Sequence, residues 1–142
     1  MSNSKDARTS AVGILAAYIP EDVSFSTDKL IISIHEETLA LEGIYLRPEQ
    51  PNFSRNVRVF LTKDDQKYPR NGWHKFPAEN IRVEYDGNFN ADFFRTIPGE
   101  GVIFLNLDPA THCYSYAMDI SFTKEGSNES FHVICSSTMI HQ

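Results

Sequence analysis

The chain has 142 residues, of which 41% are hydrophobic and 23% are charged, and its formal net charge is −6. This length and composition suit one globular domain with a sizeable core, and they exclude a largely disordered chain. No apolar run reaches the ~18 residues that a membrane-spanning helix needs, and the acidic balance argues against general nucleic-acid binding.

The sequence divides into a short flexible segment and one domain. Residues 1–9, MSNSKDART, are polar and are expected to be a flexible N-terminus. Residues 10–142 contain no linker, internal repeat or low-complexity tract, and they are expected to form a single domain.

The first apolar run, AVGILAAYI at residues 11–19, has two interpretations. We favour a first strand over a signal peptide, because Asp6 precedes the run and Pro20 with two acids follows it. The chain has only two cysteines, too few for a disulfide framework. The expected compartment is therefore the cytoplasm, and secretion is the minority interpretation.

Apolar residues alternate with mostly polar ones over much of the remaining chain. The alternating segments are residues 30–35, 57–61, 81–85, 113–122 and 131–135. A period of two predicts half-buried strands, and no window shows a convincing helical stripe. Turn-forming residues separate the later segments at short intervals, which predicts antiparallel hairpins in the C-terminal half. We therefore expect an all-β fold: an antiparallel β-sandwich of about eight or nine strands, with a closed β-barrel as the alternative.

Parity predicts the register of the hairpin around Asp86–Asn88. A two-residue turn there would place apolar residues opposite polar ones on the same side of the sheet. A three-residue loop instead places Tyr85 opposite Phe89, so that apolar side chains share one face. We predict the three-residue loop.

The last hairpin gives a second register and a prediction for the cysteines. A turn at Gly126–Ser127 makes three apolar pairs on one face: Phe122 with Phe131, Ile120 with Val133 and Met118 with Cys135. Cys113 then points to the opposite face from Cys135. We therefore expect two free thiols, with Cys135 buried as a small hydrophobic residue.

Motifs of catalysis and metal binding are incomplete in this sequence. The zinc-protease start at His35-Glu36-Glu37 lacks its second His, because residue 39 is Leu. The alternating Asp and Asn side chains of residues 86–92 lack the Gly and the Glu that a calcium loop has at its sixth and twelfth positions. A nucleophile elbow, a Walker loop and a dinucleotide fingerprint are also missing. We expect no enzymatic activity, no cofactor and no metal.

Positive charge is concentrated in one part of this acidic chain. Residues 55–82 hold seven basic and three acidic residues, a net charge of +4, whereas the remainder holds six basic and sixteen acidic residues, a net charge of −10. Inside this basic segment lies KYPRNGWHKFP, residues 67–77, with the only Trp of the chain. The candidate binding residues are Tyr68, Arg70, Trp73, His74, Lys75 and Phe76.

This aromatic stretch has a structural and a functional interpretation. It lies in a long, irregular connection between the strand ending near Leu61 and the one starting near Asn80. Large aromatic side chains are more often packed than displayed, so we favour Trp73 and Phe76 as a plug over one end of the fold. In the alternative, Trp73 is exposed in a recognition site, because Trp, Tyr and Arg supply much of the energy of interfaces.

Three functions follow, in decreasing order of preference. The first is a non-enzymatic binding or protein-interaction module that meets a protein partner or its own copy, with the basic segment against the acidic remainder. The second is a lectin-like, carbohydrate-binding module that uses the Trp73 loop, the polar face of residues 88–92 or both. The third is an enzyme whose site is assembled from distant strands.

Overall fold

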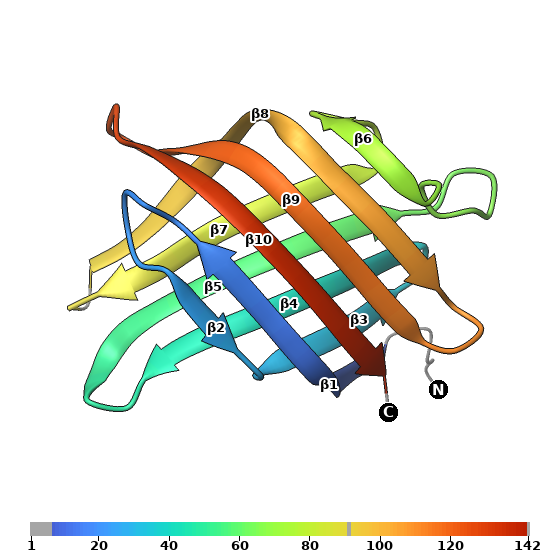
Figure 1. Cartoon of the computed structure of the whole chain (residues 1–142), viewed down its shortest axis with the longest axis horizontal. Coiled ribbons are helices and arrows are strands. Elements are labelled where there is room, and N and C mark those ends of the chain that lie inside the picture. Colours follow the sequence, from blue (N-terminus) through green and yellow to red (C-terminus); the bar gives the residue numbers. More distant parts are fainter. Residues whose placement is uncertain (1–6, 91, 142) are drawn as a thin grey trace.

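The computed structural model describes residues 7–90 and 92–141, which form ten β-strands and no helix (Figure 1). The strands are β1 (Ala7–Tyr18), β2 (Phe25–Thr27), β3 (Leu30–His35), β4 (Thr38–Arg47), β5 (Gln50–Thr62), β6 (Gly72–Phe76), β7 (Ile81–Phe89), β8 (Asp92–Asp108), β9 (Cys113–Lys124) and β10 (Ser130–His141). Every pairing between them is antiparallel. The predicted all-β, antiparallel fold class is confirmed.

Eight of the strands close into a barrel. Strands β1, β3, β4, β5, β7, β8, β9 and β10 pair in this order, and β10 returns to pair with β1. The seam between β1 and β10 runs from Ala11 opposite His141 to Tyr18 opposite Ile134. The architecture is thus the closed barrel named as the alternative, not the sandwich, because this seam leaves no open edge between two separate sheets.

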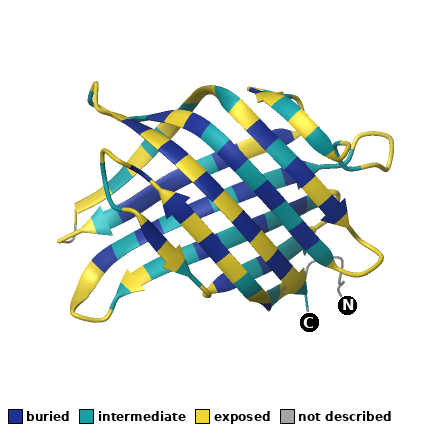
Figure 2. Cartoon of the chain, viewed as in Figure 1, coloured by how far each residue is buried: buried dark blue, intermediate teal, exposed yellow. Residues whose placement is uncertain are grey.

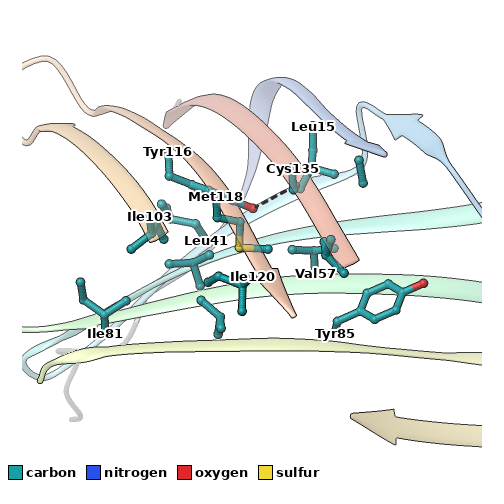
Figure 3. Packing of buried hydrophobic residues seen from close by; sticks show 14 of the residues in the cluster. Leu15, Leu41, Val57, Ile81, Tyr85, Ile103, Tyr116, Met118, Ile120 and Cys135 are labelled. Carbon is teal, nitrogen blue, oxygen red and sulfur yellow. Dashed lines mark hydrogen bonds between the residues drawn. The ribbon is translucent and has the colours of Figure 1, made fainter. Parts of the chain in front are cut away.

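Side chains fill the interior of the barrel. Buried and exposed residues alternate along the strands, so each strand presents one apolar face to the inside (Figure 2). Leu15, Leu41, Ile103 and Ile120 come from different strands and point into this common core (Figure 3). A Cβ built on Gly43 would lie 2.6 Å from Cδ1 of Leu15, so the core is closely packed at this point.

A bulge in β8 changes the partner of this strand. Pro98 pairs with Phe122 and Gly101 with Ile120, so one extra residue lies between these pairs on β8. β8 pairs with β7 from Asp92 to Arg95 and with β6 beyond the bulge. The connection that we expected to be irregular therefore contains the strand β6.

The β9–β10 hairpin has the predicted register. The three predicted pairs, Phe122 with Phe131, Ile120 with Val133 and Met118 with Cys135, all form. Both cysteines are free, and Cys135 is buried. Alternation on both strands was sufficient here, because a slip of one residue would turn the whole apolar face toward water.

The predicted register of the β7–β8 hairpin is wrong. β7 continues to Phe89, which pairs with Asp92, so the turn lies beyond the expected loop and Tyr85 does not face Phe89. Asp86 is buried in the strand, where its carboxylate accepts hydrogen bonds from Asn56 (3.0 Å) and Arg58 (2.7 Å). These tertiary hydrogen bonds hold a turn-forming residue in an extended strand.

The N-terminal prediction is tested only in part. Residues 1–6 lie outside the described residues, but Ala7–Thr9 begin β1 and pair with residues 32–34 of β3, so this part is not a free end. The run at residues 11–19 falls in β1 as expected, up to Tyr18. The part of the chain that the structure describes holds no helix of the length and hydropathy needed to span a bilayer.

The two thiols are expected to differ in reactivity. Cys135 is 2% exposed, and burial raises the pKa of its thiol to about 12, against a smaller opposite effect of the Tyr116 hydroxyl. Cys113 is only half-buried. Because the thiolate is the reactive form, Ellman's reagent should modify only Cys113 in the native protein and both thiols after unfolding. Two rapidly reacting thiols in the folded protein, or one in the folded Cys113→Ser variant, would contradict the burial of Cys135.

Candidate recognition surface

The two sides of the barrel differ in their charge. On the outer face of β4, β5 and β7, Glu42, Arg58 and Glu84 lie side by side across three strands. Arg58 is 3.3 Å from Glu84 and 2.7 Å from Asp86, measured from its Nε and Nη2 atoms. This side of the barrel therefore carries a network of ion pairs.

The opposite side, formed by β1, β10, β9, the second half of β8 and β6, carries few charges; these strands are nearest the viewer in Figure 1. We call the outward-facing residues of its central part the low-charge face: Val12, Ile14, Ala16, Tyr18, Trp73, Lys75, Val102, Phe104, Asn106, Ser115, Ala117, Asp119, Ile134, Ser136, Thr138 and Ile140. Of these residues only Lys75 and Asp119 carry a formal charge, and the Asp119 carboxylate contacts the imidazole of His132. This side is thus poor in charge and rich in exposed apolar side chains.

Strand register arranges the centre of this face in two neighbouring rows. The ridge row runs across the strands as Lys75, Val102, Asp119, Ile134 and Tyr18. The trough row, two residues further along each strand, runs as Trp73, Phe104, Ala117, Ser136 and Ala16. Large side chains lie in the first row over β10 and β1, and small ones lie beside them in the second.

The small side chains of the trough row leave an open groove. A hollow of about 520 Å³ lies on the side of the ridge row, between Tyr18 and Trp73. A second hollow of about 240 Å³ lies on the side of Ile14 and Thr138. Ala16, Ala117 and Ser136 line both hollows, so we treat the two as one trough with these residues as its floor.

Trp73 lies at one end of this trough and is 60% exposed. Its ring meets Phe104 edge-on at a centroid distance of 5.1 Å, and Arg70 donates to its carbonyl oxygen (3.2 Å). The plug interpretation is therefore wrong for Trp73, whereas Phe76 is 7% exposed and joins the core. The alternation of β6 explains both positions, because Trp73 and Phe76 lie on opposite faces of the strand.

The other predicted binding residues are not gathered in one site. Lys75 is exposed and pairs with Val102 at the edge of the trough. Arg70 lies along the open edge of β6. His74 donates from Nε2 to the carbonyl oxygen of Arg70 (2.7 Å), and Tyr68 packs against the core. Of the six candidates, only Trp73 and Lys75 belong to the low-charge face.

Sequence reasoning missed the contribution of β1 and β10 to this surface. Tyr18 is 58% exposed, and Ile14 is 57% exposed. A signal was present, since the run at residues 11–19 is apolar at both odd and even positions. In a strand with one face in the core, such a run implies an apolar face on the outside as well.

The basic segment does not form a large positive surface. Arg55 is buried and binds both carboxylate oxygens of Asp22, at 2.7 and 2.9 Å. Arg58 belongs to the ion-pair network described above, and Arg82 lies 3.9 Å from Glu84. These contacts neutralise three of its cations within the molecule, which weakens the expectation that the segment binds the acidic part of another copy.

Asp22, Arg55 and Tyr85 form a cluster at one end of the barrel, in which Arg55 and Tyr85 both donate hydrogen bonds to the Asp22 carboxylate. Burial acts to raise the pKa of the Asp22 carboxyl, but hydrogen bonds from Arg55 and Tyr85 and the charge of Arg55 outweigh it, so this pKa is lowered. Arg55 also donates to the carbonyl oxygens of Ser54 and Asn88. With its donors used in this way, the cluster acts as a structural latch on the β1–β2 connection.

Metal ligands do not converge in the described part of the chain. Residues 7–90 and 92–141 hold no group of three or more His, Cys, Asp or Glu side chains that could share an ion. Comparisons with protein-family models, with curated proteins and with solved structures found no match for this chain. Its function is therefore argued from the chemistry of its surface.

Proposed function

We propose that this protein is a non-enzymatic binding module, and that the low-charge face is its recognition surface for a protein partner. The observation that supports this most directly is the uneven distribution of charge over the barrel. Charged residues make up 23% of the chain, yet of the sixteen residues named for this face only Lys75 and Asp119 carry a formal charge.

The physical reason is the cost of removing charges from water. Each charged group that is removed from water on binding makes the binding free energy less favourable. The cores of interfaces are therefore depleted in charge and enriched in aromatic residues. Trp73 and Tyr18 supply two exposed aromatic rings beside the trough, and Trp and Tyr are frequent hot-spot residues.

The shape of the trough indicates the form of the ligand. From Trp73 on β6 to Ala16 on β1 the floor crosses four strand spacings, or about 19 Å at ~4.8 Å for each spacing. An extended peptide segment of about six residues has this length. Apolar side chains of such a segment would fill the space above Ala117 and Ser136.

A selection of random peptides displayed on phage tests this proposal with no partner chosen in advance. Peptides rich in Trp, Leu or Ile should be enriched on the immobilised protein. Their affinity should fall at least tenfold for Ser136→Arg, which fills the trough, and stay unchanged for Ser33→Arg on the outer face of β3. Lack of enrichment, or equal binding by both variants, would overturn the proposal.

A second candidate, carbohydrate binding, is favoured by one observation. Hydroxyl and amide side chains line the second hollow of the trough that ends at Trp73, among them Asn106 and the hydrogen-bonded pair of Ser115 and Thr138 (3.1 Å). Sugars stack their apolar faces on such rings and bind polar groups at their rims. A glycan array followed by titration of Trp emission tests this candidate. Absence of binding on the array, or binding that survives Trp73→Ala, would remove it.

A further inference from the structure

Over β10 and β1, the two central rows of the low-charge face are complementary in size to each other. On β1, Tyr18 in the ridge row is followed by Ala16 in the trough row, and on β10 Ile134 is followed by Ser136. Each of these two strands therefore pairs a large outward side chain with a small one, separated by about 7 Å along the strand. A surface with a ridge and a groove of matching size side by side can pack against a rotated copy of itself.

We propose that the partner of the low-charge face is a second copy of this chain. This inference rests on the function proposed above and names the occupant of the same surface. A two-fold axis that lies in the interface, parallel to the rows and between them, places the ridge row of each copy over the trough row of the other. Tyr18 of each copy then lies over Ala16 of the other, and Ile134 lies over Ser136.

The β6 end of the rows supports the same arrangement through its charge. The same two-fold axis places Lys75 of each copy over Trp73 of the other. An ammonium group over the face of an indole ring is attracted to it, and Trp is the best aromatic partner for such a contact. Lys75 is exposed and Trp73 is mostly exposed, so both groups are free to meet across the interface.

Electrostatics favours contact between two copies through this face and not through the other side of the barrel. Each copy carries a net charge of −6, so two copies repel unless the approaching surfaces are close to neutral. The two formal charges of the low-charge face, on Lys75 and Asp119, are opposite in sign, and the Asp119 carboxylate contacts the imidazole of His132 within the same copy. The face around Glu42, Arg58 and Glu84 would have to desolvate an ion-pair network instead.

The size of the face limits the strength of the dimer. It spans about 19 Å across the strands and about 20 Å from Val12 to Tyr18, or about 400 Å² in projection for each copy. Specific interfaces of this size are at the weak end of the known range. We therefore expect a reversible dimer that dissociates at micromolar concentrations.

Sedimentation velocity over a dilution series, with Trp emission in parallel, tests the dimer. The apparent mass should rise with concentration from the 16.2 kDa of one chain toward twice this value. Because the chain has one Trp, its emission maximum should move to the blue as the dimer forms. Ser136→Arg should remain monomeric with unshifted emission, whereas Ser33→Arg should behave as the wild type.

Milder variants distinguish the loss of the interface from a folding defect. Tyr18→Ala adds no charge and should weaken the dimer at least tenfold, and Lys75→Gln should weaken it several-fold, with Lys67→Gln as the matched control. Far-ultraviolet circular dichroism shows whether each variant is folded. A wild type that stays monomeric up to millimolar concentration would overturn the second copy as partner, and so would a dimer that Tyr18→Ala and Lys75→Gln leave intact. Peptides selected on a monomeric protein and lost in Ser136→Arg would still support the proposed function.

Discussion

Replacing Arg55 with Leu should lower the free energy of unfolding by about 3–5 kcal/mol, the usual cost of removing one partner from a buried ion pair. The Arg55 side chain is 4% exposed and that of Asp22 is 14% exposed, so Leu would leave the Asp22 carboxylate in a poorly hydrated position. The variant would also lose the contacts of the guanidinium with the rings of Phe53 (4.3 Å) and Phe94 (4.9 Å). Urea denaturation of the two proteins measures the difference.

The double variant Asp22→Leu/Arg55→Leu serves as the control for this effect. It removes both charges, so its loss of stability should be smaller than the sum of the two single losses. A single Arg55→Leu variant that loses less than about 1 kcal/mol, the scale of an exposed ion pair, would show that the latch contributes little.

The same ion pair predicts how the effect depends on pH. The folded-state pKa of Asp22 is lowered, so its contribution to stability is fully present above the unfolded pKa of about 3.9 and is lost as the pH falls through the folded value. The stability difference between wild type and Arg55→Leu should therefore be large at pH 7 and shrink in acid below about pH 4. A difference that stays constant down to pH 2 would contradict this assignment.

Gly13→Ala should lower the free energy of unfolding by about 4 kcal/mol, because it combines backbone strain with a steric overlap at the barrel seam. Gly13 has a φ of +150°, and a Cβ at this position would lie 1.9 Å from the carbonyl oxygen of Thr138 on β10. β1 would have to move away from β10, which breaks the pairing that closes the barrel. Thermal and urea denaturation, each with the wild type alongside, measure the loss.

Gly126→Ala separates the two parts of this cost. Gly126 also has a positive φ, +78°, but a Cβ there meets nothing within 4 Å. This variant should introduce backbone strain alone, which lowers the free energy of unfolding by about 1–2 kcal/mol. Equal losses for Gly13→Ala and Gly126→Ala would mean that the seam tolerates the overlap.

The local sequence pattern predicted the strand register correctly where both neighbouring strands alternate between apolar and polar residues. In the β9–β10 hairpin, inward residues such as Ile120 and Val133 alternate on both strands, so their parity determines the register. The β7–β8 hairpin failed because its apparent turn residues have partners elsewhere in the fold. A Cβ on Gly87 would lie 2.3 Å from the carbonyl oxygen of Ser54, so the glycine serves a close approach between strands and not a turn.

The candidate surface was predicted in part for a related reason. The aromatic stretch around Trp73 stood out by composition, but its strand β6 is defined by pairing with β8, which no local pattern reveals. The choice between sandwich and barrel depended in the same way on the contact between β1 and β10. Such non-local pairings bring Tyr18 and Trp73 to the same trough, although they lie far apart in the chain.

The seam between β1 and β10 also has a consequence for the order of folding. Residues 11–18 pair with residues 134–141, so the barrel cannot close until the second of these segments has left the ribosome. Until then β1 has an unpaired edge along this length, next to the exposed side chains of Val12 and Ile14. Contacts between such distant segments form slowly. A nascent chain, or one shortened before β10, would therefore expose an unpaired strand edge that other chains can pair with, until β10 is present.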